Sequence, residues 1–207
     1  SNLLEGTEAD LIPFFNSSPI IFLILIPAIT MRSIAEERRT GTMELLFTRP
    51  ISDLKIVLAK YFASVTLMII AILPTLIYYI SMRSLTMEGE TFDNGATITS
   101  YIGLILIGSA FVAIGIFASA LTSSQIVAFI LALFCCWIFM PQIGGLALLG
   151  SYNLMGDFDS VVQYFGMTYH YDGIQKGVID TKNIVYFLSV ITLFIYAALT
   201  VIKSLEK

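Results

Sequence analysis

Residues 31–60 read MRSIAEERRTGTMELLFTRPISDLKIVLAK and lie between two long apolar runs, residues 11–31 and 54–82. A helix needs about 20 mainly apolar residues to cross a hydrocarbon core of roughly 30 Å, and both flanking runs reach that length. Most charges of this region lie in the short segment between the runs, and Lys55 and Lys60 fall at the start of the second run. The stretch therefore predicts two membrane-spanning helices joined by a polar connection.

The composition of the whole chain indicates that lipid is its main solvent. Of the 207 residues, 57% are hydrophobic and 13% are charged, and the mean hydropathy of +0.87 lies outside the range of ordinary soluble domains. Five apolar runs are long enough to span a membrane: residues 11–31, 54–82, 98–121, 126–149 and 184–202. They are continuous and do not alternate with period two, as barrel strands would. We predict an all-α, polytopic transmembrane helical bundle that forms one domain over residues 1–207.

Prolines are expected to shape three of these spans. Pro74 should kink the second span and Pro141 the fourth, since proline removes a backbone donor and clashes with the preceding turn. The first span has the weakest pattern because polar residues and prolines interrupt its start: Pro13, Asn16, Ser17, Ser18 and Pro19. We expect this span to be irregular at its amino end.

Basic residues predict the orientation in the membrane. Six of the eleven lie in the first connection: Arg32, Arg38, Arg39, Arg49, Lys55 and Lys60. Because cytoplasmic connections are enriched in Lys and Arg, this connection should be cytoplasmic. Alternation then places residues 83–97 and the loop at 150–183 outside, with the turn at 122–125 and the carboxyl end inside. Five spans with a cytoplasmic carboxyl end require an extracytoplasmic amino end, so we expect a further span upstream of this sequence.

The first connection contains a short amphipathic helix, within residues 35–49. Thr42 can cap it, Glu44 lies in its first turn, where the helix dipole favours an acid, and Pro50 ends it. Its apolar residues share one face at i, i+3, i+4 spacing: Met43, Leu46 and Phe47. Such a helix can rest on the lipid surface or dock into a groove of a soluble partner. Periodicity alone leaves both interpretations open.

The pattern A-E-E-R-R-x-G-T-x-E-L-L-x-x-x-P at residues 35–50 resembles the coupling-helix signature of type-2 ABC transporter permeases. The resemblance continues through residues 56–60 and 169–189 and covers essentially the whole chain. It is closest to the permease subunit of the gliding-motility-associated ABC transporter, and a related branch serves maturation of nitrous-oxide reductase copper sites. The family has six spans, and this sequence begins at what would be the second. The resemblance implies an exporter subunit in a bacterial cytoplasmic (inner) membrane.

In that family a permease dimer pairs with two cytoplasmic ATPase subunits, and the coupling helix sits in a cleft on each ATPase. The resemblance therefore implies an ATPase-contact set in this chain. Its polar members are Glu36, Glu37, Arg38, Arg39, Gly41, Thr42 and Glu44, and its apolar plug is Met43, Leu46 and Phe47. Gly41 should permit a sharp turn before the short helix. The chain has no G-x-x-x-x-G-K-[ST], so ATP and Mg are expected on the partner ATPase, with no cofactor in this chain.

Other chemistry-bearing residues favour structural interpretations. His170 is expected to be a surface or internally satisfied residue, and the dispersed Asp157, Asp159, Asp172 and Asp180 to be solvated charges without a metal. Cys135 and Cys136 are interpreted as small membrane-facing hydrophobic residues. Gly108, Gly115 and Ser119 put small residues on one side of the third span, which favours close packing within the subunit over a dimer seam. Residues 140–152 favour a partly re-entrant hairpin or a plain kink.

Several function classes are disfavoured by the sequence. The spans carry no G-x-S-x-G, H-E-x-x-H or mid-span Asp or Glu, so an intramembrane enzyme is not indicated. No basic patch interleaved with aromatic residues points to nucleic acid. A membrane anchor or scaffold for a cytoplasmic partner, without transport of its own, stays the alternative to a permease. Polar residues within the spans are too ordinary to define a substrate.

Overall fold

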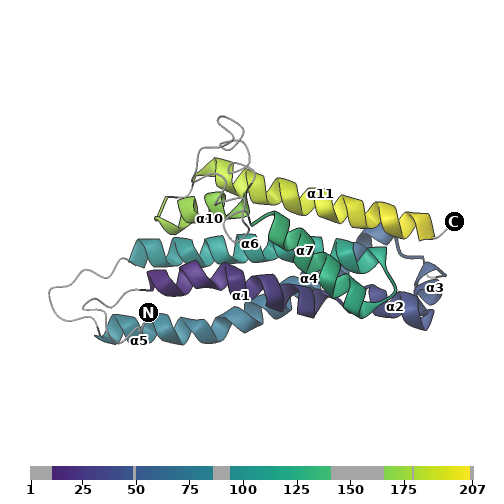
Figure 1. Cartoon of the computed structure of the whole chain (residues 1–207), viewed down its shortest axis with the longest axis horizontal. Coiled ribbons are helices and arrows are strands. Elements are labelled where there is room, and N and C mark those ends of the chain that lie inside the picture. The colour runs from purple at the N-terminus through teal and green to yellow at the C-terminus, as the bar shows by residue number, and fades with distance from the viewer. Residues whose placement is uncertain (1–10, 49, 86–93, 141–165, 179, 206–207) are drawn as a thin grey trace.

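The computed structural model describes residues 11–48, 50–85, 94–140, 166–178 and 180–205. Every regular element in these residues is a helix, which confirms the all-α bundle. The longest helices lie side by side around α6 (Asn94–Leu121), as Figure 1 shows. Among the helices of membrane length, α6 is the most deeply buried. It is therefore the central support of the subunit.

Helix α1 (Ile12–Thr30) is continuous, and its expected irregular start is not observed. Pro13 lies in the first turn, where a helix has no internal partner for the missing N–H. Pro19 and Pro27 lie inside the helix. Just before Pro19, the Ser18 hydroxyl donates to the Phe14 carbonyl at 2.7 Å. In a membrane helix, such contacts make internal prolines tolerable.

The second predicted span is broken at Pro74, as expected. Helix α4 (Asp53–Ile72) passes into a short 3-10 turn, η1 (Leu73–Thr75), and then into α5 (Leu76–Leu85). Proline cannot donate the α-helical hydrogen bond, and the tighter turn absorbs the change. On α6, the Tyr101 hydroxyl donates to the Thr75 carbonyl at 3.0 Å. This bond attaches the break to the central helix.

Small residues let neighbouring helices approach α6 closely, which confirms the prediction of packing within one subunit. A methyl group at Gly108 would collide with the sulfur of Met68 on α4 and lie 3.1 Å from Phe22 on α1. One at Gly115 would lie 2.8 Å from Cβ of Thr30 on α1. Only glycine leaves room for these contacts.

Helix α7 (Gln125–Ile138) ends well before the predicted limit of the fourth span at residue 149. Its 14 residues are about 21 Å long, less than the roughly 30 Å of a hydrocarbon core. Pro141 and the remainder of the 140–152 hairpin lie outside the described residues, apart from Met140. Cys136 is fully buried in the core, so its membrane-facing interpretation was wrong, whereas Cys135 is half-buried.

Helix α10 (Met167–Gln175) packs on the outer part of α6, inside the predicted extracytoplasmic loop. The Met167 N–H donates to the Phe139 carbonyl just after α7, at 2.9 Å. His170 of α10 is buried, its Nδ1 lies 2.8 Å from Oδ1 of Asn183, and its ring stacks on Tyr186. The expectation of an internally satisfied histidine is confirmed.

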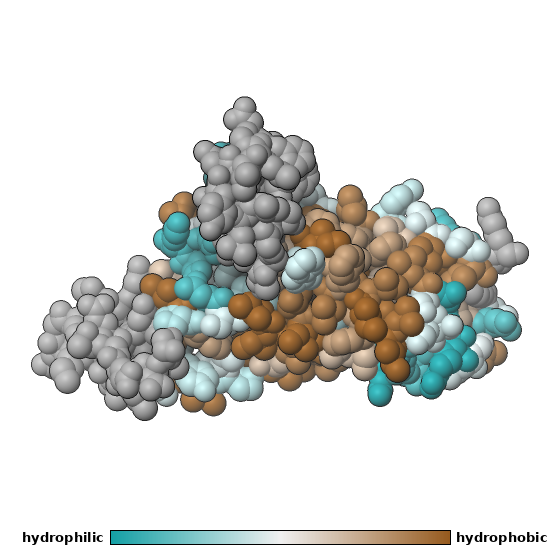
Figure 2. Space-filling view, viewed as in Figure 1, coloured by the Kyte–Doolittle hydropathy of each residue, from teal (hydrophilic) through white to brown (hydrophobic). Residues whose placement is uncertain are grey.

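Helix α11 (Thr181–Leu205) completes the bundle and packs extensively along α6. By length and apolar composition, four described segments could cross a membrane: Ile12–Thr40, Asp53–Ser81, Asn94–Leu121 and Thr181–Leu205. Figure 2 shows apolar side chains across the middle of the molecule and hydrophilic ones gathered at the end that carries α2 and α3. The chain is a multi-pass membrane protein.

Candidate functional site

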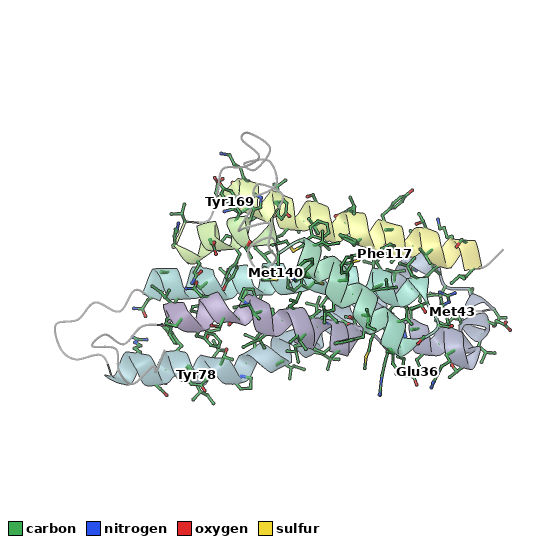
Figure 3. The ribbon with its side chains drawn as sticks, in the orientation of Figure 1. Glu36, Met43, Tyr78, Phe117, Met140 and Tyr169 are labelled. Atoms are coloured by element: carbon green, nitrogen blue, oxygen red, sulfur yellow. The ribbon has the colours of Figure 1, made fainter. Side chains whose placement is uncertain are left out.

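The connection after α1 folds into an ordered elbow, defined here as residues 31–48. A turn follows α1, and two helices of six residues come next, α2 (Ala35–Thr40) and α3 (Thr42–Phe47). Both lie at the end of the bundle where α6 ends and α4 begins (Figure 1). The predicted coupling helix is therefore two short helices. Figure 3 shows Glu36 and Met43 at this same end.

Ser119 of α6 joins the elbow to the bundle. Its hydroxyl oxygen accepts the backbone N–H groups of Ile34 and Ala35, both at 3.0 Å, and donates to the Met31 carbonyl at 3.1 Å. A hydroxyl has one donor and two acceptor positions, so these three bonds use its full capacity. The residue before α2 is Ile34, which has no side chain able to cap a helix. Ser119 takes that role from 85 residues away.

Arg38 makes the complementary contact in the opposite direction. Its guanidinium donates to the Ala120 carbonyl in the last turn of α6. The last four carbonyl groups of a helix have no partner within it, and a cation there also interacts favourably with the helix dipole. The end of α6 therefore caps the start of α2, and α2 caps the end of α6.

Glu37 attaches α2 to α4. Its Oε1 forms an ion pair with the Lys60 ammonium, and about a quarter of each side chain is exposed (23% for Glu37 and 28% for Lys60). Within the described residues, Glu37 Oε2 is buried without a hydrogen-bond partner. Since an unpaired carboxylate in a partly buried position is costly, Lys60 is needed to keep Glu37 in place. Three contacts thus hold α2 against α4 and α6.

Gly41 forms the corner between α2 and α3. Its φ of 74° lies in the left-handed region, and a methyl group there would meet no atom within 4 Å. The predicted sharp turn is confirmed, and the need for glycine comes from the backbone alone. The prediction that Thr42 caps the helix was wrong: Gly41 is the cap residue, and the Thr42 hydroxyl lies 2.9 Å from that of Thr40. Glu44 lies in the first turn, as predicted.

The corner turns α3 so that Met43 enters the core, with 5% of it exposed. Leu45 points outward instead and is 66% exposed. Leu46 is half-buried, and the Phe47 side chain lies outside the described part of the structure. The helix ends at Phe47, three residues before Pro50. The apolar face expected from i, i+3, i+4 spacing is thus partly used inside this chain. Among the described side chains of α3, Leu45 is the exposed apolar one.

The elbow that carries Leu45 also exposes polar residues. The expected contact residues that are exposed are Arg39, Gly41, Thr42 and Glu44, and those that are partly exposed are Glu36, Glu37 and Arg38. The structure brings all of them together at one end of the bundle, but Glu37 and Arg38 are already engaged within the chain. Among the described side chains of the elbow, Leu45 is thus the exposed large apolar one, and the other exposed groups are charged or carry hydroxyls, apart from Gly41.

Three residues that matter here were not in the expected set. Leu45 was missed because it falls off the apolar face of the isolated helix, and Lys60 because its partner lies 23 residues away. Ser119 was recognised only as a small residue, since nothing in the sequence shows which helix end its hydroxyl meets. Among the described residues no group of His, Cys, Asp and Glu could hold a metal ion.

The fold and the clamped elbow define a helical membrane protein with an ordered polar connection at one end. A family model described as ABC-2 family transporter protein matches residues 6–205. The chain belongs to this family, and it is a membrane permease subunit of an ABC transporter. No curated protein matches the chain closely enough to count as a relative.

Proposed function

We propose that the elbow is the surface on which a separate cytoplasmic ATPase subunit docks, so that ATP hydrolysis there moves the helices of this permease. Family membership supports an ABC ATPase as partner. The observation that carries the proposal is the exposed Leu45 on an elbow that is held to the bundle through Ser119, Arg38 and Glu37. An exposed leucine on an elbow that also exposes Arg39 and Glu44 is suited to a groove on a soluble protein.

The mechanism is mechanical. A push on α3 reaches α2 across the Gly41 corner, and α2 is bonded to α6 through Arg38 and to α4 through Glu37. A rigid connection transmits displacement, whereas a flexible loop would absorb it. The bonds at Ser119 make the break between α1 and α2 rigid as well. Closure of the ATPase would therefore displace α1, α4 and α6 together.

We further propose export across a bacterial inner membrane by a dimer of permease subunits, as in the gliding-motility type of transporter. The support is the resemblance of the motif at residues 35–50 together with the family match. The alternative is a membrane anchor that holds a cytoplasmic partner without moving a substrate. It would share the docking surface, but the partner's ATP hydrolysis would not depend on the bonds that make the elbow rigid.

The test is co-purification of the chain, in nanodiscs, with the ATPase subunits encoded by neighbouring genes. Leu45→Asp should weaken binding by about tenfold or more, because the apolar anchor becomes a charge that must be desolvated. Val178→Asp is the matched control, since Val178 is 65% exposed and lies next to α10, at the other end of the bundle. Equal binding by both variants and the unchanged protein would refute docking through Leu45.

The rate of ATP hydrolysis distinguishes a permease from a membrane anchor. In the bound complex, Ser119→Ala should lower the ATPase rate while the amount of bound ATPase stays the same, because the docking surface is intact and only its connection to α6 is weakened. A pure anchor would leave the rate unchanged.

A further inference from the structure

A backbone carbonyl in α1 lacks its normal helical partner. In an α-helix the carbonyl of residue 15 would accept the N–H of residue 19, but residue 19 is proline and has no N–H. A carbonyl left unpaired inside a membrane protein is costly. The Tyr171 hydroxyl, from α10, donates to this Phe15 carbonyl at 2.9 Å. Pro19 thus leaves the Phe15 carbonyl of α1 without a helical donor, and Tyr171 of α10 supplies one.

Tyr171 is held tightly in this position. It is 1% exposed, and its ring lies against Gly103 of α6, where a methyl group would come within 3.2 Å of the ring carbon Cδ2. One turn further along α10, the Gln175 amide donates to Oδ1 of Asn16 at 2.9 Å. The side of α10 that carries Tyr171 therefore rests on α6 and bonds to the start of α1.

Helix α1 connects this contact to the elbow. Phe15 and Met31 are 16 residues apart, about 24 Å along a helix, and Met31 is the residue whose carbonyl accepts from Ser119. The two contacts are thus at opposite ends of one continuous helix. A displacement of α1 at the elbow would therefore also move the Phe15 carbonyl to which the Tyr171 hydroxyl donates.

We propose that Tyr171 is a positioning residue for α10: its hydroxyl holds α10 on the carbonyl that Pro19 frees, so that α10 follows movements of α1. This inference rests on the proposed function for the source of the movement, but the hydroxyl contact itself does not. Together with the Gln175–Asn16 bond, the contact connects α10 to the start of α1, and it is the buried one of the two.

A double-mutant cycle tests the contact on the permease alone, in nanodiscs, by hydrogen exchange of the α10 amides. Tyr171→Phe should speed their exchange by about tenfold, because it strands a buried carbonyl. In a Pro19→Ala background the same change should have less than about a twofold effect, since residue 19 now supplies the missing N–H. The same acceleration in both backgrounds, or none in either, would overturn the inference. Tyr196→Phe, at an exposed tyrosine of α11, is the control.

A second measurement tests the relay. With the partner ATPase bound, a non-hydrolysable ATP analogue should change α10 exchange in the unchanged protein and not in Tyr171→Phe. An equal change in both proteins would show that α10 follows the ATPase without Tyr171, which contradicts the inference. Absence of ATPase binding would refute the proposed function and the relay with it, while the double-mutant cycle would still decide whether Tyr171 positions α10.

Discussion

Replacing Ser119 by alanine should loosen the elbow without changing the rest of the bundle. The substitution removes one hydroxyl and takes the partner from two buried backbone groups, the Ile34 and Ala35 N–H groups, and from the partly buried Met31 carbonyl. Each unpaired buried group costs about 1–3 kcal/mol, and local relaxation at the polar end of the bundle recovers part of that. We expect a loss of at least about 2 kcal/mol in the local stability of the elbow.

That loss corresponds to roughly 30-fold faster amide exchange, because every 1.4 kcal/mol is about tenfold in an opening equilibrium. The assay is hydrogen–deuterium exchange of peptides that cover residues 31–39, in nanodiscs. Ser18→Ala is the matched control: Ser18 is also a buried serine, but its hydroxyl only donates back to the Phe14 carbonyl of its own helix. If both variants exchange residues 31–39 at the unchanged rate, Ser119 does not hold the elbow and the reasoning fails.

Substitutions at Gly115, at Gly41 and in the Glu37–Lys60 pair test the packing and charge of the same region by unfolding in mixed detergent. Gly115→Ala should cost about 1–3 kcal/mol, because its methyl group would collide with Thr30 and force α1 away from α6; an unchanged midpoint would contradict the close approach. Gly41→Ala should cost about 1 kcal/mol from the positive φ alone, and Gly41→Asn less, since asparagine tolerates that conformation better; the reverse order would argue against a left-handed corner. Lys60→Met should destabilise more than Lys60→Met combined with Glu37→Gln, because only the single change leaves a partly buried carboxylate unpaired; equal losses would mean that the ion pair contributes little.

Four of the five predicted spans correspond to helices of membrane length, and they were predictable because membrane crossing imposes a length and a composition that few soluble segments meet. The break at Pro74 and the corner at Gly41 were predictable as well, since proline and glycine act on the local backbone whatever surrounds them. Small residues on α6 indicated close packing for a similar reason, because the space left by a small side chain is occupied by a neighbouring helix. These features depend on residues close together in sequence.

The outward face of the elbow was not predictable in the same way. Helical spacing grouped Met43 with Leu46 and Phe47, but α3 is only six residues long, and its rotation is set by the corner at Gly41. Met43 consequently enters the core and Leu45 faces outward. Amphipathic spacing tells which residues share a face, whereas tertiary packing decides where that face points.

Hydrogen bonds between distant residues were also hidden in the sequence. Ser119 and Tyr171 belong to no motif in the sequence, and their partners are backbone groups 85 and 156 residues away. The available signals were indirect: a helix start without a capping side chain at Ile34, and a carbonyl freed by Pro19. Backbone groups of this kind need a partner elsewhere in the chain, but the sequence does not show which residue supplies it.

The most direct test of the central claim is hydrogen exchange of the permease, in nanodiscs, before and after addition of the partner ATPase without nucleotide. Docking on the elbow predicts strong protection of residues 42–48, which contain the exposed Leu45, and no protection of α5 at the opposite end of the bundle. Bound ATPase with residues 42–48 still exchanging at their original rate would contradict the claim, because the partner would then be held by another surface.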